Sequence, residues 1–96
     1  MLRDYLVMYD ICNAKRLAKV FKLMKGFGRH LQYSVFQCDL SEADMVRMKS
    51  ALAEVVDHRE DQVLIFDLGQ SNGSRAELVE AVGRAYERVP RAALVI

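Results

Sequence analysis

A continuous run of apolar and aromatic residues, Tyr5 to Tyr9, ends abruptly in Asp10 and is the feature that most constrains the fold. A strand that is apolar at every position is covered on both faces, so the run is typical of a central strand in a sheet. The chain has 96 residues, of which 52% are hydrophobic, and this is enough for one core. We therefore expect a single domain, residues 1–96, with Asp10 at the rim of its sheet.

The residues after the first strand predict a helix followed by two strands. Asn13 can cap the helix, and Gly26 and Gly28 can close it. The apolar residues that recur at helical spacing, and that we expect to be buried, are Leu17, Val20, Phe21 and Met24. Residues 31–40 then favour a short strand, a bend near Ser34 and a longer strand.

The remaining sequence predicts two further helices with a strand between them. Ser41 begins a capping-box variant, and the amphipathic helix that follows it is expected to end near His58. Residues 63–66 are a short apolar run that favours a strand. A second capping box opens a helix over residues 74–90, which Pro90 stops.

The order of these elements is that of an α+β, ferredoxin-like βαββαβ fold. Its core is expected over about residues 4–69, with an added C-terminal helix and terminal strand over about residues 74–96. The last five residues, 92–96, are apolar, and such a tail would be prone to aggregate if left unpaired. We expect it to pair with a sheet edge, either in its own chain or in a second copy.

Asp10 has two interpretations. It is either a turn-forming or capping aspartate, or a carboxylate ligand for Mg²⁺ or Mn²⁺, hard cations that bind carboxylates together with waters and phosphate oxygens. A single carboxylate per chain is a small set of ligands for a metal ion. A two-fold dimer with apposed strand ends, however, would bring two copies of Asp10 to one metal. Asp67 is a weaker rival as a metal ligand, and His30 and His58 are interpreted as helix-end or surface histidines.

The charge of the chain is unevenly distributed. Residues 1–38 carry seven Lys or Arg against two Asp, whereas the remaining residues carry seven Lys or Arg against eleven acidic residues. The basic residues that follow one another along the first predicted helix are Lys15, Arg16, Lys19 and Lys22. This pattern indicates either a track for the phosphates of a nucleic acid or a solvated helix face, and the sequence alone favours neither.

The two cysteines, Cys12 and Cys38, do not form the even, closely spaced pattern of a disulfide scaffold or a zinc site. We interpret them as free, buried thiols of a protein in the reducing cytoplasm. No stretch of the sequence approaches the length of a membrane-spanning helix, so no membrane association is expected.

Several segments of the chain occur together in an order that is specific as a combination. They are Tyr9-Asp-Ile at the end of the first strand, Lys15-Arg16 at the start of the helix, Gly28 at its end, Gln32-Tyr-Ser-Val-Phe36 and Asp61-Gln-Val-Leu-Ile-Phe66. In this combination the chain resembles the second family of CRISPR-associated proteins, written here Cas-two, over roughly residues 4–69. The resemblance implies a ferredoxin-like homodimer with the sheets facing each other and the terminal strands exchanged.

The resemblance also implies a metal-dependent endonuclease acting on RNA or DNA, with Asp10 of both chains as catalytic residue and metal ligand at the dimer axis. Tyr9, Arg16 and Phe36 fall at positions where the family places residues that line the same cleft. The family works beside the Cas-one integrase during spacer acquisition, where its dimer is a scaffold that spans the DNA.

One departure from the family bears on the metal. The family often has acidic residues shortly after the strand-end aspartate, where this chain has Cys12, Asn13 and Ala14, which leaves fewer protein ligands. Two other functions therefore stay open beside the nuclease. One is a non-catalytic, DNA-binding dimeric scaffold of the integration complex, and the other is a related toxin-type ribonuclease.

Overall fold

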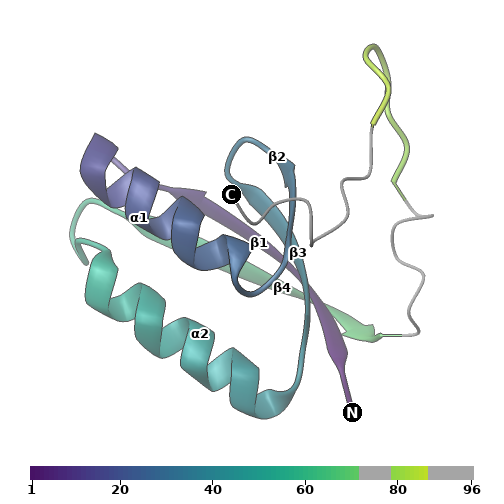
Figure 1. Cartoon of the computed structure of the whole chain (residues 1–96), viewed down its shortest axis with the longest axis horizontal. Helices are drawn as coiled ribbons and strands as arrows, with labels where there is room; N and C mark the ends of the chain where they lie inside the picture. Colours follow the sequence, from purple (N-terminus) through teal and green to yellow (C-terminus); the bar gives the residue numbers. More distant parts are fainter. Residues whose placement is uncertain (72–78, 87–96) are drawn as a thin grey trace.

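The computed structural model of the chain describes residues 1–71 and 79–86, and in these residues it contains four strands and two helices (Figure 1). They are, in chain order, β1 (Arg3–Asp10), α1 (Ala14–Lys25), β2 (Arg29–Gln32), β3 (Val35–Leu40), α2 (Glu42–Val55) and β4 (Gln62–Gln70). The strands form one antiparallel sheet in the order β2-β3-β1-β4. The predicted ferredoxin-like βαββαβ arrangement is thereby confirmed.

Strand β1 lies in the interior of the sheet. Its Val7 pairs with Phe36 of β3 on one side and with Ile65 of β4 on the other, and the Val7 side chain has no solvent exposure. Backbone hydrogen bonds on both edges leave the two faces of the strand as the only surfaces that other parts of the molecule can cover. The prediction of a central strand is confirmed, but the strand begins at Arg3 rather than at Tyr5, and the expectation that both its faces are covered is wrong for the described residues, since helices lie on one face only.

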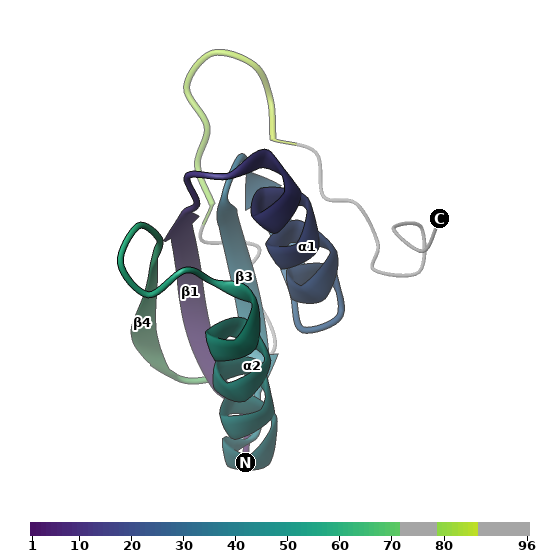
Figure 2. The ribbon, with the colours of Figure 1, turned by 90° about the vertical axis from the view of Figure 1, so that its left-hand side faces the viewer.

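Both helices pack on the same face of the sheet (Figure 2). The Asn13 side chain accepts hydrogen bonds from the backbone N–H groups of Lys15 and Arg16, each at 3.0 Å, and so caps α1. Ser41 caps α2 in the same way by accepting from the backbone of Asp44 at 3.1 Å. Both predicted helix starts are therefore confirmed.

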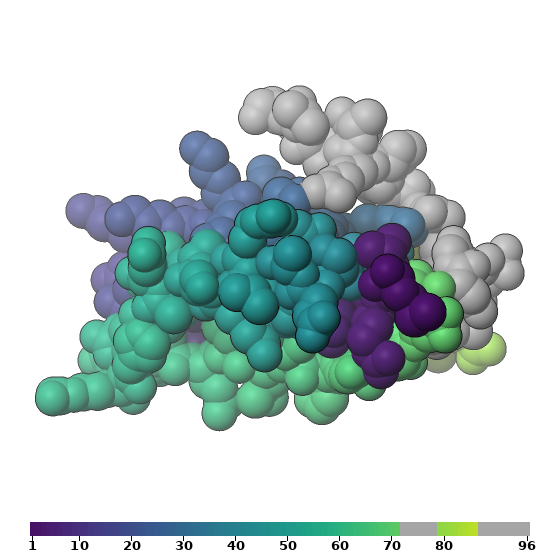
Figure 3. Space-filling view, turned by 90° about the horizontal axis from the view of Figure 1, so that it is seen from below, coloured from purple at the N-terminus to yellow at the C-terminus, as the bar shows by residue number. Residues whose placement is uncertain are grey.

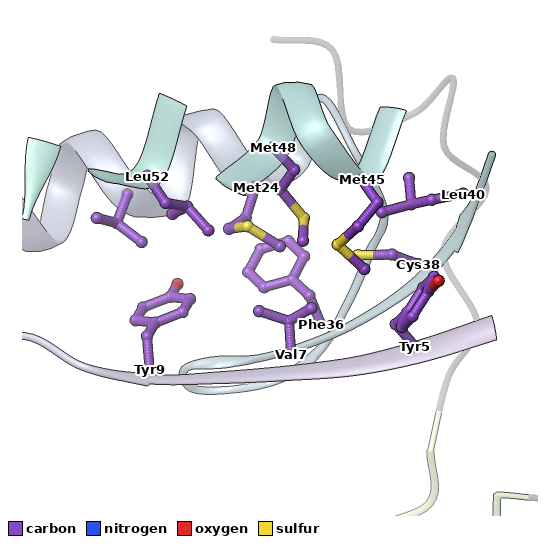
Figure 4. Close-up of a cluster of buried hydrophobic side chains, with 11 residues drawn as sticks. Tyr5, Val7, Tyr9, Met24, Phe36, Cys38, Leu40, Met45, Met48 and Leu52 are labelled. Carbon is purple, nitrogen blue, oxygen red and sulfur yellow. The ribbon is translucent and has the colours of Figure 1, made fainter. Parts of the chain in front are cut away.

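The core lies between the helices and the sheet (Figure 4). Its buried residues are Tyr5, Val7, Tyr9, Val20, Met24, Phe36, Cys38, Leu40, Met45, Met48 and Leu52. Where α1 turns into β2 it approaches β3 closely, since a Cβ on Gly28 would overlap the Gln37 carbonyl oxygen and lie 2.5 Å from the Cys38 sulfur. Only glycine fits at this crossing, which explains why the helix is followed by Gly28.

The opposite face of the sheet is also apolar. Because side chains alternate along a strand, Leu6 and Met8 point away from the helices, and they pair with Phe66 and Leu64 of β4. Leu64 and Phe66 are each 44% exposed. We call Leu6, Met8, Leu64 and Phe66 the open face. An apolar strand that has helices on one side only leaves a surface of a kind that other molecules bind.

Two predictions about burial were wrong. Leu17, expected in the buried stripe of α1, is 39% exposed, because it borders a groove at the edge of the helix–sheet contact. Cys12, expected to be buried, is exposed in the loop after β1, where its sulfur donates a hydrogen bond to the Glu60 carbonyl oxygen. Cys38 is buried in the core, and neither Cys12 nor Cys38 forms a disulfide, as predicted.

The second half of the chain differs from prediction at two places. Strand β4 continues to Gln70, so Asp67 lies within it rather than at its end. The helix expected over residues 74–90 is absent from residues 79–86, where Gly83 has a φ of 91° and Val82 is fully exposed. A left-handed residue interrupts a helix, and a segment that buries no apolar face gains little from forming one. The rest of that helix and the terminal strand lie outside the described residues.

Candidate active site at the end of strand β1

Asp10 is the last residue of β1 and is exposed. It lies opposite Gln62 of β4, and by strand alternation it shares the open face with Leu6 and Met8. Within residues 1–71 and 79–86 its carboxylate forms no hydrogen bond or ion pair. Asp10 is therefore a carboxylate with free acceptor oxygens, held by a strand of the sheet at the border of an apolar surface.

The loop that follows Asp10 is tied down by a buried carboxylate from another part of the chain. Asp61, in the loop between α2 and β4, accepts from the backbone N–H of Cys12 at 2.9 Å and from that of Asp57 at 2.8 Å. The Arg16 guanidinium donates to the same carboxylate at 2.7 and 3.2 Å, and the Asp61 side chain is fully inaccessible to solvent. We call this set of contacts the Asp61 clamp.

The clamp is an electrostatically strong arrangement. The hydrogen bond from Arg16 and those from the two backbone N–H groups hold the pKa of Asp61 far below its ordinary value of 3.8, although burial opposes this. Arg16 also reaches Glu60 at 3.2 Å. Its guanidinium is thus committed to acidic partners within the chain, and the sequence pattern that grouped Arg16 with the lysines did not reveal this.

The lysines of α1 are placed differently. Lys15, Lys19 and Lys22 are exposed, and their ammonium groups form no ion pair with any residue that the structure describes. The first turn of α1 also contains no acidic residue. Of the four basic residues predicted to contact nucleic acid, these three present free positive charge on one side of the helix.

Tyr9 and Phe36, expected beside the site, belong to the core next to it. Phe36 has no exposure, and its ring centroid lies 6.2 Å from that of Tyr9 in a stacked arrangement. Burial raises the pKa of the Tyr9 hydroxyl, so this phenol stays protonated at neutral pH. The backbone N–H of Tyr9 donates to the Ser34 carbonyl at 3.1 Å. These residues support the end of β1 from within.

The other acids and histidines considered from the sequence have partners elsewhere. Asp67 pairs with Arg3 at 3.1 Å, and this contact lowers the pKa of Asp67. The ring of His58 donates to the Ala53 carbonyl oxygen at 2.8 Å, as expected of a helix-end histidine. The described part of the chain contains no cluster of three or more His, Cys, Asp or Glu residues that could hold a metal ion.

The oxygen ligands at the end of β1 are of the type that a divalent metal prefers, but one chain supplies too few of them. The Asp10 oxygens are hard ligands of the type that Mg²⁺ and Mn²⁺ prefer. Asp61, the nearest acid along the adjoining loop, has its oxygens occupied by Arg16 and two backbone N–H groups. At this strand end, the described residues of one chain therefore offer one carboxylate without a partner, Asp10, and a second chain would supply another.

Fold and site together define a small ferredoxin-like α+β protein with a basic helix and a free carboxylate at the end of its central strand. No helix formed by residues 1–71 and 79–86 is long and apolar enough to cross a membrane. Residues 3–76 match the model of the family described as CRISPR associated protein Cas2. The chain belongs to this family, as its sequence pattern indicated.

Individual relatives agree with this assignment. The chain is 41% identical to the CRISPR-associated endoribonuclease Cas2 of Geobacter sulfurreducens, over 96% of each chain. It is 42% identical to the CRISPR-associated endoribonuclease Cas2 1 of Rhodospirillum rubrum, over 96% of this chain and 89% of that protein. The crystal structure of Streptococcus pyogenes Cas2 superposes with a TM-score of 0.70 at 29% identity, covering 83% of this chain and 99% of that one.

The Asp61 clamp predicts a specific dependence of stability on pH. Asp61→Asn should lower the urea midpoint of unfolding at pH 7, because it removes a buried charge that pairs with Arg16. A carboxyl group whose pKa is depressed by folding stabilises the protein above its unfolded pKa and loses this effect as pH falls through the folded pKa. The difference between wild type and Asp61→Asn should therefore shrink progressively below pH 3.8.

Glu60→Gln is the matched control, since Glu60 also pairs with Arg16 but its side chain is 61% exposed. Exposed ion pairs contribute little, so this variant should unfold at nearly the wild-type midpoint. Equal midpoints for Asp61→Asn and Glu60→Gln at pH 7 would contradict the role assigned to the buried carboxylate.

Proposed function

We propose that this protein is a dimeric, metal-dependent endonuclease that cleaves RNA or DNA phosphodiesters during CRISPR adaptation. Family membership and the endoribonuclease names of its relatives support the nuclease activity. The observation that carries the proposal is the position of Asp10, a free carboxylate on the same face of β1 as Leu6 and Met8.

A second copy of the chain is the proposed partner of the open face. Leu64 and Phe66 are each 44% exposed beside Leu6 and Met8, and covering such side chains is favourable by about 25 cal/mol for each Å² of apolar surface. A two-fold interface pairs the same surface of both molecules. Because Asp10 borders that surface, a face-to-face dimer would place both copies of Asp10 at its rim.

In this proposal the two copies of Asp10 would hold Mg²⁺ or Mn²⁺, which when bound supplies Lewis-acid polarisation of a phosphoryl oxygen and an activated water. The remaining tasks belong to the chain itself. The Asp61 clamp holds the loop after Asp10 in one conformation, so that the carboxylate keeps its orientation. The exposed Lys15, Lys19 and Lys22 attract and position the phosphate backbone.

Asp10→Asn tests the catalytic role. The amide has the shape of the carboxylate but no negative charge for a cation, so metal-dependent cleavage of RNA and DNA should fall by roughly 100-fold or more. Wild-type cleavage should also disappear in the presence of a chelator. Glu54→Gln, at an exposed position on α2, is the control and should cleave at the wild-type rate. Undiminished cleavage by Asp10→Asn would exclude Asp10 from the reaction.

Phe66→Glu tests the dimer. A charge placed at the centre of an apolar interface loses its hydration without gaining a partner, so the variant should sediment as a monomer at concentrations where the wild type is a dimer. The control is Val46→Glu, since Val46 is 60% exposed on α2, which lies on the helical side of the sheet (Figures 2 and 3). A dimer that persists in Phe66→Glu would show that the open face is not the interface.

The three free lysines on α1 also favour a second candidate function, a non-catalytic scaffold on which DNA is held for the Cas-one integrase. Here spacer acquisition would be indifferent to Asp10→Asn. It would be abolished by reversing Lys15, Lys19 and Lys22 to Glu, because the reversals repel the phosphates that the lysines attract.

The lysine reversals make a quantitative prediction for DNA binding. If each lysine contacts a phosphate, their loss should weaken binding and reduce the slope of log affinity against log salt by about three. Lys49→Glu on α2 reverses one lysine away from α1 and should leave the salt slope nearly unchanged, whereas each of the three reversals on α1 should lower it by about one. Normal DNA binding by the triple variant would contradict both functions as proposed here, since both use these lysines.

A further inference from the structure

A groove of about 360 Å³ separates α1 from the β2–β3 turn, away from the open face. Three of the side chains that line it are aromatic, and the others are small or apolar. The residues that matter for its chemistry are Tyr9, Leu17, Ala18, Phe21, Tyr33 and Ser34. Figure 1 shows α1 and the β2–β3 hairpin side by side at this edge of the molecule. The groove is an apolar slot of the kind that binds a flat ligand.

Tyr33, which lines this groove, has an unusual backbone conformation and a highly exposed side chain. Its side chain is 85% exposed, and its backbone has a φ of 40°, in the left-handed region that glycine or asparagine adopts far more easily than tyrosine. The ring of His30 holds the turn by donating to the Tyr33 carbonyl oxygen at 2.6 Å. A strained backbone that presents a large aromatic ring to solvent is typical of a binding position.

The rim of the groove is positively charged. Lys15 and Lys22 lie three residues before and four residues after Ala18, so their side chains border the wall that Ala18 forms. The Lys25 ammonium lies 5.0 Å from the centroid of the Phe21 ring. The complementary ligand is therefore a flat, apolar ring system that carries anionic groups at its edge.

We propose that this groove binds one unpaired base of a single-stranded RNA or DNA segment. The base would stack on Tyr33 and Phe21, while Lys15 and Lys22 contact its flanking phosphates. Bases inside a duplex are stacked on each other and cannot enter, so the groove distinguishes single-stranded from paired regions. This inference rests on the proposed nucleic-acid function, but it does not depend on Asp10 or on cleavage.

The test uses two fluorescently labelled single-stranded thymidine oligonucleotides of equal length, one of them with abasic sites in place of its central nucleotides. Both carry the same phosphates, so their affinities differ only through the bases. Because stacking of one base on an aromatic residue changes affinity about tenfold, the wild type should bind the intact strand about ten times more tightly. Tyr33→Asn should bring that ratio well below ten, because the Phe21 ring alone then remains for stacking.

Asparagine is chosen because it adopts the left-handed backbone easily and removes the ring. Tyr33→Phe keeps the ring and should retain the tenfold ratio, which separates stacking from any effect on folding. Val46→Ser, at an exposed position on α2, should match the wild type in every measurement.

The outcomes that would overturn the groove proposal can be told apart from those that would also overturn the proposed nucleic-acid function. If the wild type binds intact and abasic strands equally, or if Tyr33→Asn keeps the tenfold ratio, the groove does not bind a base. In that case the lysine reversals can still abolish binding, and the proposed function stands. If the wild type binds neither strand, the groove proposal fails together with its nucleic-acid premise.

Discussion

The antiparallel pairing of β1 with both β3 and β4 is the constraint on which the rest of the structure depends. Because side chains alternate along a strand, this pairing turns Val7 toward the helices and Leu6 and Met8 toward the open face. One strand thus provides the centre of the core and the middle of the surface on which we propose that a second copy packs. Its last residue, Asp10, belongs to that surface.

Two aspartates near the end of β1 differ in burial and in hydrogen bonding. Asp61 is sealed from solvent, and Arg16 and two backbone N–H groups occupy its oxygens, so it stabilises the fold and cannot take a cation. Asp10 is exposed and, among the described residues, without such partners. The clamp that occupies Asp61 also removes Arg16 from the basic surface. The contrast explains why Asp10, and not Asp61, is the candidate ligand of these two aspartates.

Two neighbouring sides of α1 take part in the two proposals, one in the binding of phosphates and the other in the binding of an unpaired base. Lys15, Lys19 and Lys22 present free charge to the phosphates of any nucleic acid, paired or unpaired, and their contribution depends on salt. The side that carries Phe21 faces the groove closed by Tyr33, where stacking selects an unpaired base and depends on salt only through the flanking phosphates. The lysines of α1 are thereby assigned the attraction of phosphates, and the rings of Phe21 and Tyr33 the selection of an unpaired base.

The sequence by itself determined the order of elements, the central position of β1 and the caps at Asn13 and Ser41, because periodicity and capping depend on residues that are close along the chain. It also singled out Asp10. Only the tertiary structure decided that Arg16 meets Asp61, 45 residues away, and that Tyr33 and α1 line the same groove. A local pattern shows which side of an element is apolar or charged, but which distant segment meets that side follows from packing.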